Sequence, residues 1–90
     1  MVRAHVYIEG RVQGVFYRDW ARKNASKMGL TGWVRNLEDG RVELVAEGKK
    51  IKLTELIELI KKGPRLAKVE HVDIIWEEAT GEFHNFEIVA

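Results

Sequence analysis

The apolar residues of this 90-residue chain recur with two different periods, and the order in which these periods alternate constrains the fold more than any other feature. Residues 4–9 alternate between apolar and polar, which is typical of a half-buried β-strand, and Gly10 is expected to end that strand. From Trp20 to Met28 the apolar residues instead fall at helical spacing, and Gly29 follows where a helix would stop. The chain therefore begins with a strand, a glycine-containing loop and a helix.

The same alternation of periods continues to the end of the chain. A turn over residues 38–40, with Gly40 where a positive φ is expected, joins two strands as a hairpin. Gly63 and Pro64 end the second helix, because glycine favours the helix terminus and proline cannot continue a helix. The later strands are predicted over residues 32–37, 41–47, 69–76 and 83–89, and the second helix over residues 51–62.

The resulting order of elements is β-α-β-β-α-β with an additional C-terminal strand. This order predicts an α+β, ferredoxin-like sandwich, in which an antiparallel sheet carries two helices on one face. No internal repeat and no linker-like segment interrupts the sequence, so we expect a single domain over residues 1–90. Because this fold serves many unrelated functions, the function has to be argued from a site.

The composition excludes several classes of function. Fifteen Lys and Arg residues against fourteen Asp and Glu leave a formal net charge of +1, which disfavours bulk nucleic-acid binding. The absence of cysteine excludes disulfides, thiolate nucleophiles and cysteine metal sites. No apolar run approaches the roughly 18–20 residues that span a bilayer, and the first residues lack the apolar stretch of a signal peptide. We therefore expect a cytoplasmic protein without a membrane partner.

The segment from Gly10 to Arg18 is the strongest candidate for a binding site. It lies between the first strand and the first helix, where successive N–H groups beside a helix N-terminus can form a concave anion site. The guanidinium of Arg18 would add a forked cation that suits phosphoryl oxygens. The alternative is an ordinary strand-to-helix turn with a solvated arginine, and the loop alone leaves both interpretations open.

Two further sets of polar residues carry weaker signals. Asn36 lies near the end of the second strand, two positions after Val34, so both side chains are expected on the same face of the strand. From there the Asn36 side chain can reach a ligand or cap the following turn. His5, His71 and His84 lie far apart and show no metal-binding spacing, which favours surface or structural roles. The sequence therefore predicts no metal site.

Taken together, the first loop and the second strand resemble the two signatures of the acylphosphatase family. The first reads Gly10-x-Val12-Gln13-Gly14-Val15-x-Tyr17-Arg18, and the second reads Gly32-Trp33-Val34-Arg35-Asn36-x-x-x-Gly40-x-Val42, ending at Gly48. The Gly-Pro pair after the second helix and residues 81–88 are also similar, so the resemblance spans nearly the whole chain. Tyr17 departs from the usual Phe, and its added hydroxyl must find a partner or water, with no expected loss of activity.

The resemblance implies hydrolysis of acyl phosphates without a cofactor or a metal. At the matching positions Arg18 would bind the phosphoryl group and Asn36 would orient the attacking water, both as catalytic residues. Inorganic phosphate would be the product and a competitive inhibitor, and a monomer is expected, although an exposed strand edge leaves a dimer open. The backbone cradle implied for the substrate consists of Val12, Gln13, Gly14, Val15, Phe16 and Tyr17, with Arg18 at its end.

Proteins with the same fold have other functions, and these are the alternatives to acyl phosphate hydrolysis. Ferredoxin-like RNA-binding modules stack bases on exposed aromatic residues, but the strand over residues 41–46 has none, and the net charge is close to zero. A metallochaperone would need a cysteine pair in the first loop. The acylphosphatase-like domain of larger carbamoyl-transferring maturation proteins shares the resemblance, and because the chain ends at Ala90 we expect a free-standing hydrolase instead.

Overall fold

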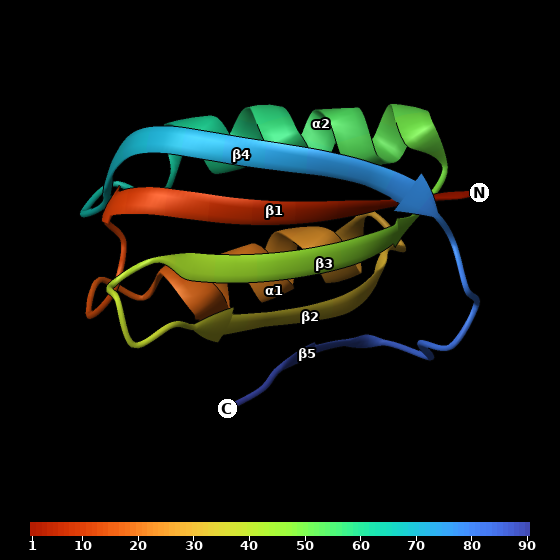
Figure 1. Ribbon diagram of the computed structural model, residues 1–90, viewed down its shortest axis with the longest axis horizontal. Helices are drawn as coiled ribbons and strands as arrows, with labels where there is room; N and C mark the ends of the chain where they lie inside the picture. Colours follow the sequence, from red (N-terminus) through yellow and green to blue (C-terminus); the bar gives the residue numbers. More distant parts are fainter.

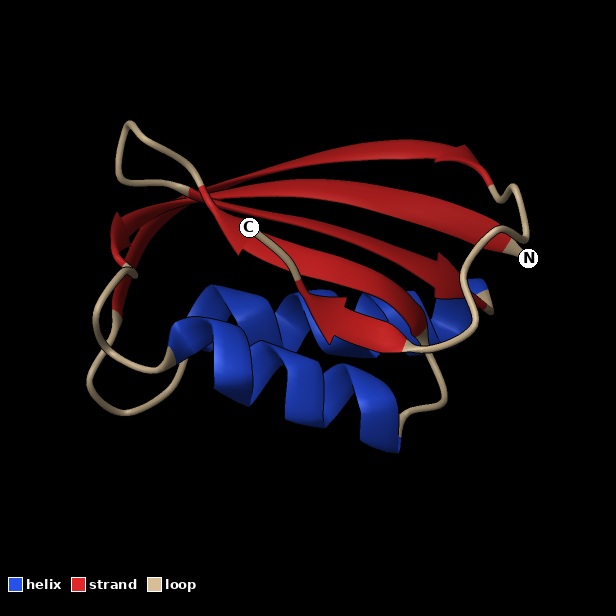
Figure 2. Ribbon diagram, turned by 90° about the horizontal axis from the view of Figure 1, so that it is seen from below, coloured by secondary structure: helices blue, strands red, loops and turns tan.

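A computed structural model describes residues 1–90 as a five-stranded sheet with two helices on one of its faces (Figure 1, Figure 2). The strands lie in the order β4-β1-β3-β2-β5 across the sheet. This arrangement confirms the predicted ferredoxin-like order and the layer of two helices. The elements are β1 (Val2–Arg11), α1 (Tyr17–Lys27), β2 (Thr31–Asn36), β3 (Val42–Gly48), α2 (Lys50–Lys62), β4 (Lys68–Glu78) and β5 (Phe86–Ile88).

The core fills the space between the sheet and the helices. Val6 of β1 lies opposite Leu44 of β3, and both side chains are fully buried against the helices. A slip of one residue in this register would turn both side chains to the opposite face, so burial of one face fixes the pairing. Neither helix is long and apolar enough to cross a membrane. The buried residues contributed by the helices are Tyr17, Ala21, Ala25, Leu53, Leu56, Ile57 and Ile60.

The expectation that Gly10 ends the first strand is wrong. β1 continues to Arg11, and its register against β4 shifts between Glu9 and Gly10, which is a β-bulge. Gly10 has a φ of 130°, and a Cβ at this position would lie 2.1 Å from the carbonyl oxygen of Lys68. The glycine therefore lets β1 pass close to the start of β4 before the chain enters the loop that precedes α1.

The C-terminal strand is shorter than predicted and runs parallel to β2, so the sheet is mixed rather than antiparallel throughout. β4 and β5 lie at opposite edges of the sheet, and residues 79–85 cross from one edge to the other (Figure 1). This crossing occurs at the end of the sheet where β2 begins, and the chain consequently enters β5 in the direction of β2. Val34 pairs with Ile88 in the resulting parallel ladder.

Tyr17 joins the first turn of α1 to the last turn of α2. Its ring is buried, and its hydroxyl donates a hydrogen bond of 2.7 Å to the main-chain carbonyl oxygen of Ile60. In a continuing helix that carbonyl would accept from the N–H four residues later, but this position is Pro64, which has no N–H. The hydroxyl therefore has the partner that the sequence required, and burial raises the pKa of Tyr17.

Replacing Tyr17 by Phe should lower the free energy of unfolding by about 1–2 kcal/mol, because a buried carbonyl loses its hydrogen-bond partner. The aromatic ring keeps its packing, so the fold and the loop before α1 should be preserved. Urea unfolding of wild type and Tyr17→Phe, followed by far-ultraviolet circular dichroism, measures the difference. Identical unfolding midpoints and slopes would contradict this account of the hydroxyl.

Candidate active site

The loop between β1 and α1, residues 12–16, presents a row of backbone N–H groups. Gly14 and Phe16 have positive φ values of 73° and 63°, whereas their neighbours in the loop have negative ones. This alternation turns successive N–H groups toward one side, as in an anion-binding nest. None of the N–H groups of residues 13–19 donates to a protein acceptor, and the first to do so is that of Trp20, at 3.1 Å from the Phe16 carbonyl oxygen. The loop and the first turn of α1 thus offer donors to a ligand rich in acceptors.

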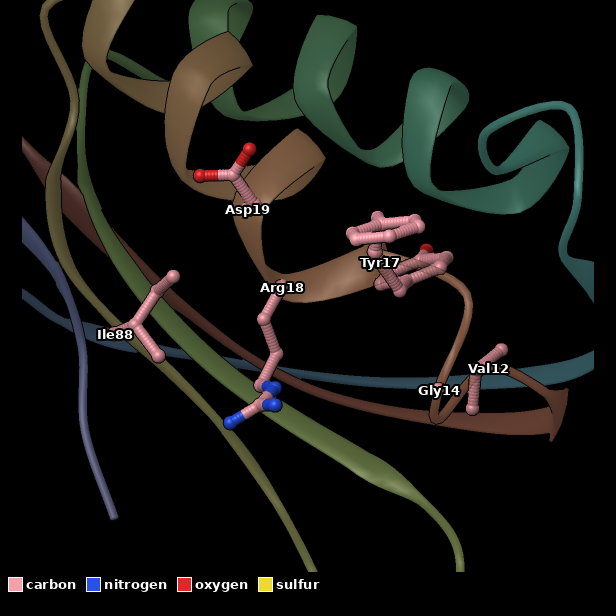
Figure 3. Close-up of a pocket in the computed structure, with 7 residues that line it drawn as sticks. Val12, Gly14, Tyr17, Arg18, Asp19 and Ile88 are labelled. Atoms are coloured by element: carbon pink, nitrogen blue, oxygen red, sulfur yellow. The ribbon is translucent and has the colours of Figure 1, made fainter.

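The loop borders a cavity of about 300 Å³ at the start of α1 (Figure 3). Gln13 and Val15 do not line it, although their main chain belongs to the loop. Ile88 enters the wall because β5 pairs with β2, a contact that the sequence analysis did not predict. The residues that line the cavity are Val12, Gly14, Phe16, Tyr17, Arg18, Asp19 and Ile88.

Arg18 provides the cation of this cavity. Its side chain is half-buried and forms no hydrogen bond or ion pair with the protein, and Figure 3 shows it pointing away from the neighbouring Asp19. Asp19 instead pairs with Arg22 at 3.0 Å and with Lys23 at 3.1 Å. Hydrogen bonds from these two cations lower the pKa of the Asp19 carboxyl below its usual range. The carboxylate is thereby engaged by cations of its own helix, and the guanidinium of Arg18 remains unpaired.

Asn36 lies at the C-terminal end of β2, opposite Val42 of β3. Its side-chain Oδ1 is buried and has no hydrogen-bond partner in the protein. A buried acceptor without a donor costs about 1–3 kcal/mol, and an O–H or N–H group of a ligand or water would remove that cost. Asn36 is not part of the cavity wall itself, but it lies on the adjoining hairpin.

The side chain of Gln13 ties the loop to this hairpin. Its Nε2 donates to the carbonyl oxygens of Leu37 at 2.7 Å and Arg41 at 2.9 Å. The N–H of Leu37 also donates to the carbonyl of Arg41 at 2.8 Å, which closes the base of the hairpin. Gln13 therefore fixes the loop against the end of β2 that carries Asn36. Sequence reasoning placed Gln13 in the cradle but missed this role, because the contacts span 24 and 28 positions of the chain.

The histidines do not line the cavity. His5 lies on the strand β1, and His84 lies in the exposed segment between β4 and β5. His71 shares a hydrogen bond of 2.9 Å with Asp73 on β4, and the ligand atoms of these two residues and Glu9 lie within 4.8 Å of one another. Sequence spacing could not reveal this exposed group, because Glu9 belongs to a different strand. No residue of the group borders the cavity.

Known proteins are similar to this chain in sequence and in fold over nearly its whole length. The family model described as Acylphosphatase matches residues 4–88. The acylphosphatase of Roseiflexus sp. (strain RS-1) is 52% identical over 89 residues, which cover 99% of this chain and 96% of that protein. The crystal structure of acylphosphatase from Bacillus subtilis has a TM-score of 0.96 and 37% sequence identity, and the match covers 100% of both chains.

A longer protein contains the same fold. The crystal structure of full-length HypF in the phosphate- and nucleotide-bound form matches with a TM-score of 0.85 and 26% identity. The match covers 100% of this chain but 12% of that one. The fold thus occurs both in small proteins and as a part of a much longer chain.

Replacing Gln13 by Ala should weaken binding of inorganic phosphate about 10-fold, the equivalent of roughly 1.4 kcal/mol. Both hydrogen bonds that hold the loop against the hairpin would be lost. Isothermal titration calorimetry with phosphate measures the change in Kd. Thr54→Ala is the matched control, since it removes a side-chain hydrogen bond to the carbonyl of Lys50 on α2 and should leave Kd unchanged. Equal affinities of Gln13→Ala and wild type would contradict the role of Gln13.

Proposed function

The chain belongs to the acylphosphatase family and is an enzyme that hydrolyses acyl phosphates, and from that premise we propose which residues carry out the reaction. The main-chain N–H groups of residues 13–19 and the guanidinium of Arg18 bind the phosphoryl group. Asn36 orients the attacking water. The observation that carries this proposal is the row of unpaired N–H groups that meets an unpaired guanidinium at the same cavity.

The charge distribution of a phosphoryl group supports this assignment. In phosphoryl transfer the negative charge is spread over three equatorial oxygens, each able to accept several hydrogen bonds. A row of converging N–H groups and one forked guanidinium supply donors in the number and arrangement that such a group needs. Because the loop acts through its main chain, the side chains of Val12, Val15 and Phe16 need no polar groups. This accounts for the apolar side chains at these three positions of the cradle.

The buried Oδ1 of Asn36 supports its assignment to the water. An oxygen without a donor can accept an O–H of water, and this hydrogen bond directs a lone pair of the water toward phosphorus. The O–P bond to water then forms as the bond between phosphorus and the acyl oxygen breaks. Positioning of this kind supplies much of the rate in phosphoryl transfer.

The chemistry of the leaving group explains why the proposed mechanism uses no general acid. The acyl group departs as a carboxylate, whose conjugate acid has a pKa of roughly 4.3 when it resembles Glu. Such an anion leaves at neutral pH without a proton. The carboxylate on the cavity wall, Asp19, is engaged by Arg22 and Lys23, so we infer that the proton of the water passes to a phosphoryl oxygen. The products are a carboxylate and inorganic phosphate.

We further propose that the substrate is a small-molecule acyl phosphate. The enzyme would act as a cytoplasmic monomer with no nucleic-acid or membrane partner. Family membership favours this hydrolase over the RNA-binding module and the metallochaperone that the fold alone would allow. The long edge strand β4 has one hydrogen-bonding side without a partner strand, which is the place where a dimer would form.

Replacing Arg18 and replacing Asn36 should have different effects on phosphate binding and on turnover. Arg18→Ala should abolish both phosphate binding and turnover, because the cradle loses its side-chain charge. Asn36→Ala should lower kcat by about 100-fold, as expected for loss of one positioned hydrogen-bonding group, and should leave the Kd for phosphate nearly unchanged. Asn85→Ala, in the exposed segment before β5, is the matched control. If both site variants weakened phosphate binding equally, this division of roles would be wrong.

Hydrolysis of benzoyl phosphate should continue unchanged in the presence of EDTA, because the proposed mechanism gives no step to a metal. Added inorganic phosphate should raise KM and leave kcat constant, since it occupies the same cavity as the phosphoryl group. Initial rates at several phosphate concentrations, each with and without EDTA, measure both effects. Loss of activity in EDTA that a divalent cation restores would overturn the metal-independent mechanism.

A further inference from the structure

A second hollow lies beside the cavity of Arg18. We call it the side groove and define it by its apolar lining, which consists of Val15, Phe16, Trp20, Pro64 and Leu66. The side groove has a volume of about 370 Å³ and lies between the start of α1 and the loop that joins α2 to β4. Phe16 and Asp19 line both hollows, so the two are direct neighbours.

The apolar surface of the side groove is open to solvent. The side chains of Phe16 and Leu66 are 76% and 60% exposed, although both are large and apolar. Contact with an apolar ligand would remove this surface from water, which favours binding. Three charged residues also line the groove. Lys23 pairs with Asp19 at 3.1 Å, so this pair adds little net charge. Arg65 is exposed and forms no ion pair, so it leaves one positive charge beside the apolar lining. The groove therefore suits an apolar group that carries no positive charge.

The backbone of Phe16 connects the groove to the cradle. Its φ of 63° and ψ of 23° are left-handed, a conformation that is a genuine outlier for a bulky residue. The same conformation turns the neighbouring N–H groups toward the cavity and leaves the ring exposed between the two hollows. One strained residue thus contributes to both surfaces.

We propose that the side groove binds the acyl group of the substrate, and that the enzyme prefers acyl phosphates with an aromatic or other large apolar acyl group. This inference rests on the proposed function, because it places the phosphoryl group in the cavity of Arg18. A substrate bound in this way lies across Phe16, with its phosphoryl group on one side and its acyl group on the other.

The order of strands in the sheet is consistent with in-line attack of water on phosphorus. In an in-line reaction the leaving oxygen lies on the side of phosphorus opposite to the attacking water. Asn36, the residue proposed to hold the water, ends β2, whereas Leu66 precedes β4. β2 and β4 lie on opposite sides of β1, the strand from which the cradle loop begins. The acyl group and the water therefore approach the cradle from opposite sides.

The experiment compares benzoyl phosphate with acetyl phosphate as substrates of wild type and Leu66→Ala. The variant should lower kcat/KM for benzoyl phosphate about 10-fold, the range found when an apolar pocket loses contact with a substrate. For acetyl phosphate, whose acyl group offers only one methyl to the groove, kcat/KM should stay constant. Leu66 does not line the cavity of Arg18, so the inhibition constant of phosphate should also stay constant.

Two further variants control this comparison. Ile51→Ala removes a similarly exposed aliphatic side chain from α2, 68% exposed, and should change neither substrate. Leu66→Asp should lower kcat/KM for benzoyl phosphate further than Leu66→Ala, because a carboxylate disfavours an apolar ligand. If the Leu66 variants changed the two substrates equally, or changed neither, the inference would be wrong. Failure of the proposed function is a separate result, because Arg18→Ala would then retain turnover of both substrates.

Discussion

The backbone N–H groups of residues 13–19 have no acceptors within the protein, and the other features of the site are arranged around this constraint. Unpaired main-chain donors persist only where water or a ligand can satisfy them. The alternating sign of φ turns these donors to one side, Gln13 holds their loop against the hairpin, and Asp19 is engaged by cations of its own helix. We propose that a multivalent anion beside Arg18 satisfies all of these groups together.

The fold fixes both ends of this loop, and we propose that the N–H groups between them bind the ligand. At one end, the bulge at Gly10 carries β1 closely past the start of β4. At the other end, Tyr17 is buried in the core, and its hydroxyl satisfies the carbonyl that Pro64 leaves unpaired at the end of α2. Because the proposed chemistry relies on main-chain groups, it needs few polar side chains and no cysteine thiol.

Most local features of this structure could be predicted from sequence, whereas its distant contacts, including the pairing with β4 that extends β1 past Gly10, could not. Periodicity and the Gly63–Pro64 pair determine the elements and the end of α2 through neighbouring residues alone. The parallel pairing of β5, the contact of Ile88 with the cavity and the hydrogen bonds of Gln13 all join residues far apart in the chain. Loop and strand positions alone made Arg18 and Asn36 candidates, but their roles could be assigned only through two family signatures. The burial of the Asn36 oxygen became visible only in the structure.

A crystal structure of the phosphate complex tests the central claim most directly. We predict a phosphate ion in the cavity, with its oxygens about 3 Å from main-chain nitrogen atoms of residues 13–19. The guanidinium of Arg18 should contact the same ion, and a water should donate to Oδ1 of Asn36. Phosphate bound elsewhere, with the loop N–H groups solvated and Arg18 directed into solvent, would contradict the account.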